Sequence, residues 1–186
     1  SIRHINTKAV SNFVIRDQNK WRTQGTSIAK MTHFAESTWS LPLHKFTFVI
    51  GNLRKISIKV LQQTVSVWAH PSLVDYGCYA LDVASSALLI MAKNYNEQLG
   101  TSKLDLVAVS EHQNEQMAGY GMSLVRQDLL LRHPDDDPIK AVRIALQVVK
   151  LVARQWFGNR ISVDKWDDLW LVEGLAANLA ADMIHD

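Results

Sequence analysis

The apolar residues in the first third of the chain fall in short runs of β-prone composition, which is typical of β-strands. The runs are residues 12–15, 45–50, 56–60 and 64–69. In the last of them, Val65, Val67 and Ala69 share one face, as in a strand with one buried side. Residues 5–69 are therefore predicted to form a sheet region.

The pattern changes to helical spacing after His70 and Pro71. Residues 72–98 carry apolar side chains at intervals of three and four, which predicts a long buried helix that ends near Gly100. Two nearly continuous apolar runs follow, at residues 104–109 and 121–126, and these predict buried strands.

Two more helices are predicted in the last third of the chain. Asp136 or Asp137 is expected to cap a helix that opens with Pro138 at its first position. The residues expected on the core side of this helix are Ile139, Val142, Ala145, Val149, Val152 and Trp156. A last helix is expected from residue 164 or 166 through residue 182. The fold class is therefore α+β.

Composition fits a folded chain and excludes several classes of protein. With 186 residues, 47% hydrophobic and 20% charged, the chain is long enough for one or two domains. The net charge is +2, and the charged residues are scattered along the chain. They form no basic stripe of the kind that indicates nucleic-acid binding. The longest apolar run, residues 87–92, is too short to span a bilayer. Cys78 has no intrachain partner, and a buried free thiol is expected.

Residues 150–159, KLVARQWFGN, have the frame of a zinc-peptidase helix without its ligands. In an H-E-x-x-H motif, two histidines one turn apart bind Zn²⁺ and the glutamate acts as general base. Those positions hold Lys150, Leu151 and Arg154 here. Neither cationic side chain offers a lone pair to zinc at neutral pH, and Leu151 cannot exchange a proton. The seven histidines contain no pair at i, i+4 spacing that would replace the motif.

Three further blocks support this register. They are QWFGN at 155–159, WDDLWLVEGLA at 166–176 and KLDLVAV at 103–109. In order and approximate spacing they resemble the zinc aminopeptidase family typified by aminopeptidase N. Residues 11–13, 41–51 and 65–71 resemble the end of that family's N-terminal β-domain more loosely. The resemblance implies that residues 1–70 are the C-terminal part of an antiparallel β-domain, and that residues 71–186 begin a thermolysin-like (gluzincin) catalytic domain.

The resemblance also assigns the remaining functional positions. The family's third zinc ligand is a glutamate that follows the second histidine after eighteen residues, and Glu173 stands at that place. The family's G-A-M-E-N loop, whose glutamate binds the substrate's α-amino group, corresponds to residues 115–119. Met117 is kept, Ala118 replaces the glutamate, and Gly119 ends the remnant. The family's transition-state tyrosine lies beyond residue 186.

These replacements lead to a hypothesis about the former metal site. Lys150 and Arg154 lie one turn apart on a helical face, and both are expected to point toward Glu173. We expect a buried cluster of ion pairs in place of the dication, and no metal cofactor, although the family binds zinc. Trp156, Trp166 and Trp170 match family positions and are expected to pack in the core.

Two functions remain open. The first is a pseudoenzyme: a non-catalytic homologue that serves as a structural module or binds a protein or peptide, for example an active aminopeptidase relative. The second is an active zinc aminopeptidase that removes N-terminal residues from peptides, with Glu173 and other residues forming its site. The first explains the substitutions directly. Family members are cytosolic or membrane-anchored, and this chain carries no signal that assigns a compartment.

Overall fold

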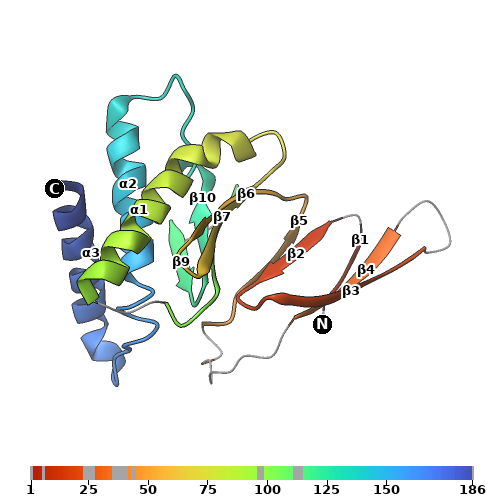
Figure 1. Ribbon diagram of the computed structural model, residues 1–186, viewed down its shortest axis with the longest axis horizontal. Helices are drawn as coiled ribbons and strands as arrows, with labels where there is room; N and C mark the ends of the chain where they lie inside the picture. Colours follow the sequence, from red (N-terminus) through yellow and green to blue (C-terminus); the bar gives the residue numbers. More distant parts are fainter. Residues whose placement is uncertain are drawn as a thin grey trace.

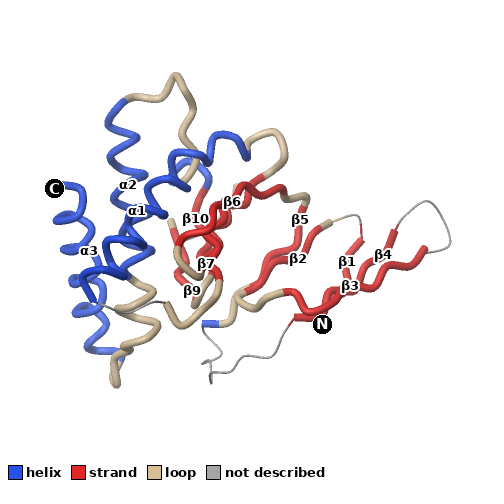
Figure 2. Tube along the Cα trace, viewed as in Figure 1, coloured by secondary structure: helices blue, strands red, loops and turns tan. Residues whose placement is uncertain are grey.

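Three helices cover one face of a five-stranded sheet, and two smaller sheets extend from its other side (Figures 1 and 2). The computed structural model describes residues 2–5, 7–22, 28–34, 42, 45–95, 99–110 and 115–185. The chain therefore has the α+β composition that the sequence predicts.

The five-stranded sheet is mixed, with the strand order β6-β7-β8-β10-β9. Its strands are β6 (Arg54–Val60), β7 (Gln63–Ala69), β8 (Lys103–Val109), β9 (Gln116–Gly119) and β10 (Met122–Arg126). β8 lies parallel to both β7 and β10, whereas β6 and β9 pair antiparallel at the two edges. Strands predicted in four of these segments are confirmed, and β9 forms where the altered loop was expected.

The helical elements also follow the predicted order. They are η2 (Val74–Gly77), α1 (Cys78–Tyr95), η3 (Gln127–Leu129), α2 (Pro138–Ala153), η4 (Trp166–Asp168) and α3 (Leu169–His185). The Asp137 side chain accepts a hydrogen bond of 2.8 Å from the backbone N–H of Ile139 at the start of α2. This cap and Pro138 at the first helical position fix where α2 begins, as predicted.

The main core lies between the sheet and the helices. Val65, Val67 and Ala69 of β7 are completely buried there, which confirms the face predicted for this strand. A second apolar cluster covers the opposite face of the sheet, where Val107 and Met122 pack with Val10 of the N-terminal strands. Burial on both faces explains why β8 reads as a nearly continuous apolar run.

Two residues predicted on the core side of α2 lie outside it. Ile139 is 61% exposed and Val142 is 50% exposed, whereas burial begins at Ile144. The first turns of α2 project beyond the end of α3 (Figure 1), so α3 does not cover their apolar side chains. The expectation of a buried thiol was also wrong, because Cys78 is exposed at the start of α1.

The smaller sheets come from residues that the apolar pattern describes less well. One has the order β1-β4-β3, with bounds Ile2–Ile5, Ile28–Phe34 and Ile15–Arg22, and the other pairs β2 (Lys8–Ser11) with β5 (Phe48–Gly51). The strand predicted at 12–15 is instead mostly the bend between β2 and β3. Residues 15–20 of β3 are exposed. This strand is therefore held by backbone pairing with β4, and its sequence shows no alternation of apolar and polar residues.

The domain boundary expected after residue 70 would divide the five-stranded sheet between two domains. β7 ends at Ala69, and its residues 64–68 pair with residues 103–107 of β8. β6 and β7 are therefore built into the same sheet as the strands of the second region. The division into domains itself stays a prediction.

One helical segment of the described residues, Val74–Tyr95, is long and apolar enough to cross a membrane when judged by length and composition alone. Half of its most apolar stretch is buried inside the fold. Its buried residues, including Ala84, Leu88 and Met91, belong to the main core.

Candidate functional site

The end of α2 and the first turns of α3 bring Lys150, Arg154 and Glu173 together. Lys150 Nζ lies 3.1 Å from Oε2 of Glu173, and Arg154 Nη2 lies 2.6 Å from Oε1. The spacing of four residues places both cations on one face of α2, and α3 packs against α2 with the carboxylate facing them. Each carboxylate oxygen thus has its own cationic partner.

This cluster is only partly buried. The side chains of Lys150, Arg154 and Glu173 are 26%, 17% and 34% exposed. The cluster therefore differs from the buried one that the sequence suggested. Partial exposure screens the charges, so each pair stabilises the fold less than a fully buried pair would.

Replacing Glu173 with alanine is expected to lower the free energy of unfolding by about 1–3 kcal/mol, between the values typical of exposed and buried ion pairs. The loss arises because two cations remain close together without their shared carboxylate. Chemical denaturation of both proteins measures the difference. Asp182→Ala removes an exposed carboxylate from the same helix and should change stability by no more than about 0.5 kcal/mol. Equal effects of the two substitutions would contradict the stabilising role of the cluster.

Two other positions of the candidate site carry apolar side chains. Leu151 is completely buried and belongs to the main core. Ala118, on edge strand β9, packs against the same core. Position 151 therefore faces packed side chains, and the methyl group of Ala118 offers no charge to a ligand.

The remainder of the altered loop has structural contacts. Met117 packs against the second apolar cluster, on the face of the sheet opposite Ala118. Gly119 lies so close to its neighbours that an added Cβ would come within 2.8 Å of the Met122 carbonyl oxygen and the Thr47 hydroxyl. Only glycine fits there without movement of the backbone.

Gln155 joins this loop to the end of α2. Its side-chain oxygen accepts a hydrogen bond of 2.9 Å from the N–H of Gly121, and its amide nitrogen donates one of 3.1 Å to the carbonyl of Gly119. Asn159 donates a second hydrogen bond to the Gly119 carbonyl, also at 3.1 Å. Gln155 is 1% exposed. These bonds fix the β9–β10 turn relative to the charged cluster.

Lys45 is a residue of this site that sequence reasoning missed. Its ammonium group donates a hydrogen bond of 2.7 Å to the carbonyl of Gly158. Burial lowers the pKa of Lys45 below its usual range, the charge of Arg154 lowers it further, and Glu173 opposes the shift. A third cation thus lies near the cluster, contributed from the segment before β5.

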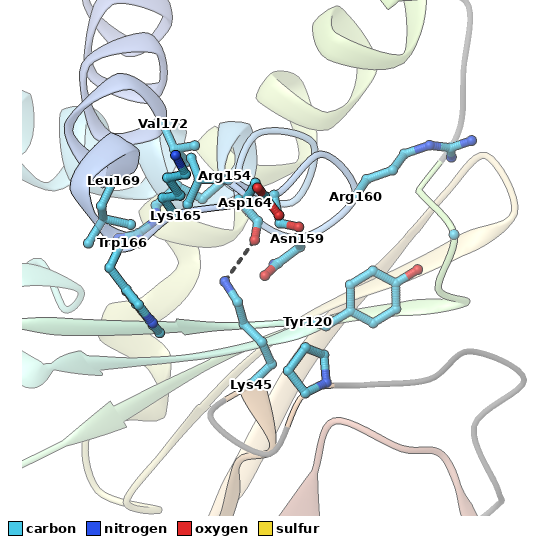
Figure 3. Close-up of a pocket in the computed structure, with 15 residues that line it drawn as sticks. Lys45, Tyr120, Arg154, Asn159, Arg160, Asp164, Lys165, Trp166, Leu169 and Val172 are labelled. Atoms are coloured by element: carbon cyan, nitrogen blue, oxygen red, sulfur yellow. Dashed lines mark hydrogen bonds between the residues drawn. The ribbon is translucent and has the colours of Figure 1, made fainter.

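An open cavity of about 540 Å³ adjoins the cluster (Figure 3). Lys45 and Arg154 contribute to its wall, and the loop from Gly158 to η4 encloses it. Gly158 has a φ of +119°, and a Cβ there would come within 3.0 Å of Val172, so this turn needs glycine. Trp166 and Leu169 supply apolar surface.

Two of the three tryptophans expected in the core are outside it. Trp156 is 3% exposed, as expected, but Trp166 and Trp170 are each 70% exposed. α3 packs against α2 mainly through Val172, Ala176 and Ala180, so the other side of its first turns faces solvent. Trp166, in η4, lines the cavity.

The chemistry of the donor set does not fit a zinc ion at this place. Zinc needs neutral imidazole, thiolate or carboxylate donors, and of the three residues only Glu173 supplies one. Within the part of the chain that the structure describes, no three His, Cys, Asp or Glu side chains gather closely enough to hold a metal ion. The arrangement is suited to holding charges of opposite sign.

Comparisons with known proteins support the family resemblance. Residues 79–186 match the Peptidase family M1 domain. Aminopeptidase N of Rattus norvegicus is 28% identical over 176 residues, which cover 92% of this chain and 18% of the relative. Aminopeptidase 2, mitochondrial, of Saccharomyces cerevisiae is 29% identical over 95% of the chain and 17% of its own length. Aminopeptidase N of Oryctolagus cuniculus is 34% identical over 61% of the chain and 12% of its own length. The chain spans less than a fifth of these relatives.

Proposed function

Because this chain belongs to peptidase family M1, we propose that it is the metal-site region of a non-catalytic family member in which an ion cluster replaces zinc. The observation that carries the proposal is the contact of both Lys150 and Arg154 with Glu173. By the family resemblance, these three residues stand where the zinc ligands would be. A cluster whose charges pair with each other has no need of a metal ion.

The positions around the cluster support the same proposal. A zinc peptidase needs a general base that reaches the metal-bound water, and such a base typically contributes about 10²–10⁴-fold to the rate. Leu151 has no proton to exchange and is buried in the core. The methyl group of Ala118 stands where the family's glutamate would bind the substrate ammonium. Without metal, base and ammonium partner, peptide hydrolysis has no route through this site.

We further propose that the retained scaffold is a structural module that binds a peptide or protein, and an active aminopeptidase relative is one candidate partner. The cavity beside Arg154 supports a binding role, since its volume of about 540 Å³ is in the range of sites for small ligands. The fixed β9–β10 turn would give a bound peptide a rigid wall.

Zinc stoichiometry is the decisive test, because all three ligand positions lie within this chain. We expect protein purified with zinc present, then freed of loosely bound ions, to contain far less than one zinc per chain by mass spectrometry. The rate at which aminoacyl reporter substrates are hydrolysed should be the same with and without a chelator. One tightly bound zinc per chain would overturn the proposal and favour the active aminopeptidase, whatever the reporter assay shows.

A further inference from the structure

The described residues that line the cavity beside the cluster carry more positive than negative charge. Its described lining residues include four cationic side chains, Lys45, Arg154, Arg160 and Lys165, and a single carboxylate, Asp164. Glu173 lies close by but already contacts both Lys150 and Arg154. Among these described residues, and with Arg160 left aside, the cationic side chains outnumber the carboxylates, which favours a positive potential in the cavity.

Lys45 and Arg154 form the centre of this positive region. Burial and the neighbouring guanidinium both disfavour the charged form of Lys45, as its lowered pKa indicates. Its ammonium has three donors, and among the described residues only the Gly158 carbonyl accepts a hydrogen bond from one of them. Arg154 has five N–H donors, of which Nη2 contacts Glu173. An anion at this place would be attracted by both charges and would find donors on both side chains.

The walls indicate what the anion is attached to. Trp166, Leu169 and Val172 line the helical side, and Tyr120 lies across from them. Figure 3 shows Lys45 reaching up between the rings of Trp166 and Tyr120, whereas Arg160 extends away from it. A ligand that buries an apolar group against these side chains would add hydrophobic stabilisation to the charge contact.

We infer that this cavity binds a carboxylate attached to an apolar group, as a peptide presents it at an apolar C-terminal residue or in an acidic side chain beside an apolar one. The inference names a ligand chemistry for the binding role proposed above and rests on that role. It reverses the charge preference that the family resemblance implies, in which a glutamate receives a substrate's ammonium.

Calorimetric titration with matched dipeptides tests the inference. N-acetyl-alanyl-phenylalanine carries the free carboxylate, and its C-terminal amide differs only in lacking that charge. We expect the acid to bind at least about tenfold more tightly than the amide, the usual effect of a charge-assisted hydrogen bond. The amide of N-acetyl-aspartyl-phenylalanine separates the two sources. Affinity equal to that of the free acid shows that the cavity accepts either source of the carboxylate, and affinity equal to that of the plain amide shows that it requires a C-terminus.

Variants connect the affinity to the cavity. Lys45→Gln should weaken binding of the acid about tenfold and leave binding of the amide nearly unchanged. Lys59→Gln, an exposed lysine on β6 outside the cavity, is the matched control and should bind like the parent. If Lys45→Gln does not fold, Lys165→Gln replaces it, with an expected loss of about threefold because this side chain is exposed.

Three outcomes would overturn the inference: equal affinity for acid and amide, no binding of either at millimolar concentration, or unchanged binding by the folded cavity variant. None of these three outcomes depends on the zinc content of the chain. If the protein contains no zinc and does not bind the acid more tightly than the amide, the non-catalytic proposal still holds. If the protein contains zinc, that proposal is overturned, whatever the peptide titration shows.

Discussion

Replacing Lys150 and Arg154 with histidine is expected to give this chain a zinc site. Glu173 already lies in contact with both side chains, so two imidazoles and one carboxylate would surround a common point. Histidine is shorter than lysine or arginine. A zinc ion with Zn–N and Zn–O bonds of about 2.0–2.2 Å would occupy the space between the shorter side chains and Glu173. We expect one zinc per chain with a dissociation constant of about 1 μM or tighter, roughly 8 kcal/mol of binding free energy.

Zinc should then stabilise the double variant and leave the parent unchanged. At a free zinc concentration one hundred times the dissociation constant, the expected gain is about 2.7 kcal/mol, read as a rise in melting temperature. Adding Glu173→Ala to the double variant removes the third ligand and should weaken zinc binding strongly, which makes it the matched control. Equal zinc binding with and without Glu173 would show that the three positions do not form one site.

Introducing glutamate at position 151 is expected to destabilise the chain by about 3–5 kcal/mol. Leu151 is completely buried in the main core, so the new carboxyl group would lose its hydration without a partner. The loss of leucine packing adds to this cost. Denaturation at pH 7 measures the effect, which should become smaller toward pH 4, where a glutamate of raised pKa is protonated.

The same substitution at an exposed position of the same helix gives the comparison. Leu146 is 37% exposed, and Leu146→Glu should change stability by no more than about 0.5 kcal/mol. Leu151→Met keeps the volume and should cost less than about 1.5 kcal/mol. If Leu151→Glu were as well tolerated as Leu146→Glu, position 151 would open to a cleft, and the argument against a general base at this place would fail.

Periodicity predicted the segments whose burial follows their own pattern. β7, α1 and α2 each have a face packed in the core, and their alternation or helical spacing is visible in the sequence. β8 is buried on both faces and is visible as a nearly continuous apolar run. β1 and β4 were missed, and β3 was displaced. Residues 15–20 of β3 are exposed, and a strand that is held by backbone pairing needs no apolar alternation. The exposure of Ile139 and Trp170 could not be predicted either, because it depends on what packs against them.

The candidate site was partly visible in the sequence for a different reason. The family motifs and the i, i+4 spacing predicted that Lys150 and Arg154 face Glu173. The structure brings these side chains together. Lys45 had no such signal, since it comes more than a hundred residues before Arg154 and the loose resemblance of residues 41–51 gives it no role. Its role depends on how the segment before β5 lies against the loop at Gly158.

The pairing of β7 with β8 has a practical consequence for protein production. A chain cut at residue 79, where the family match begins, would lose β6 and β7. The backbone groups of residues 103–107, now paired with β7, would become an open edge beside an apolar surface. Such an edge recruits strands from other molecules, so the truncated protein would aggregate. Expression of a shorter soluble version should therefore start before Arg54.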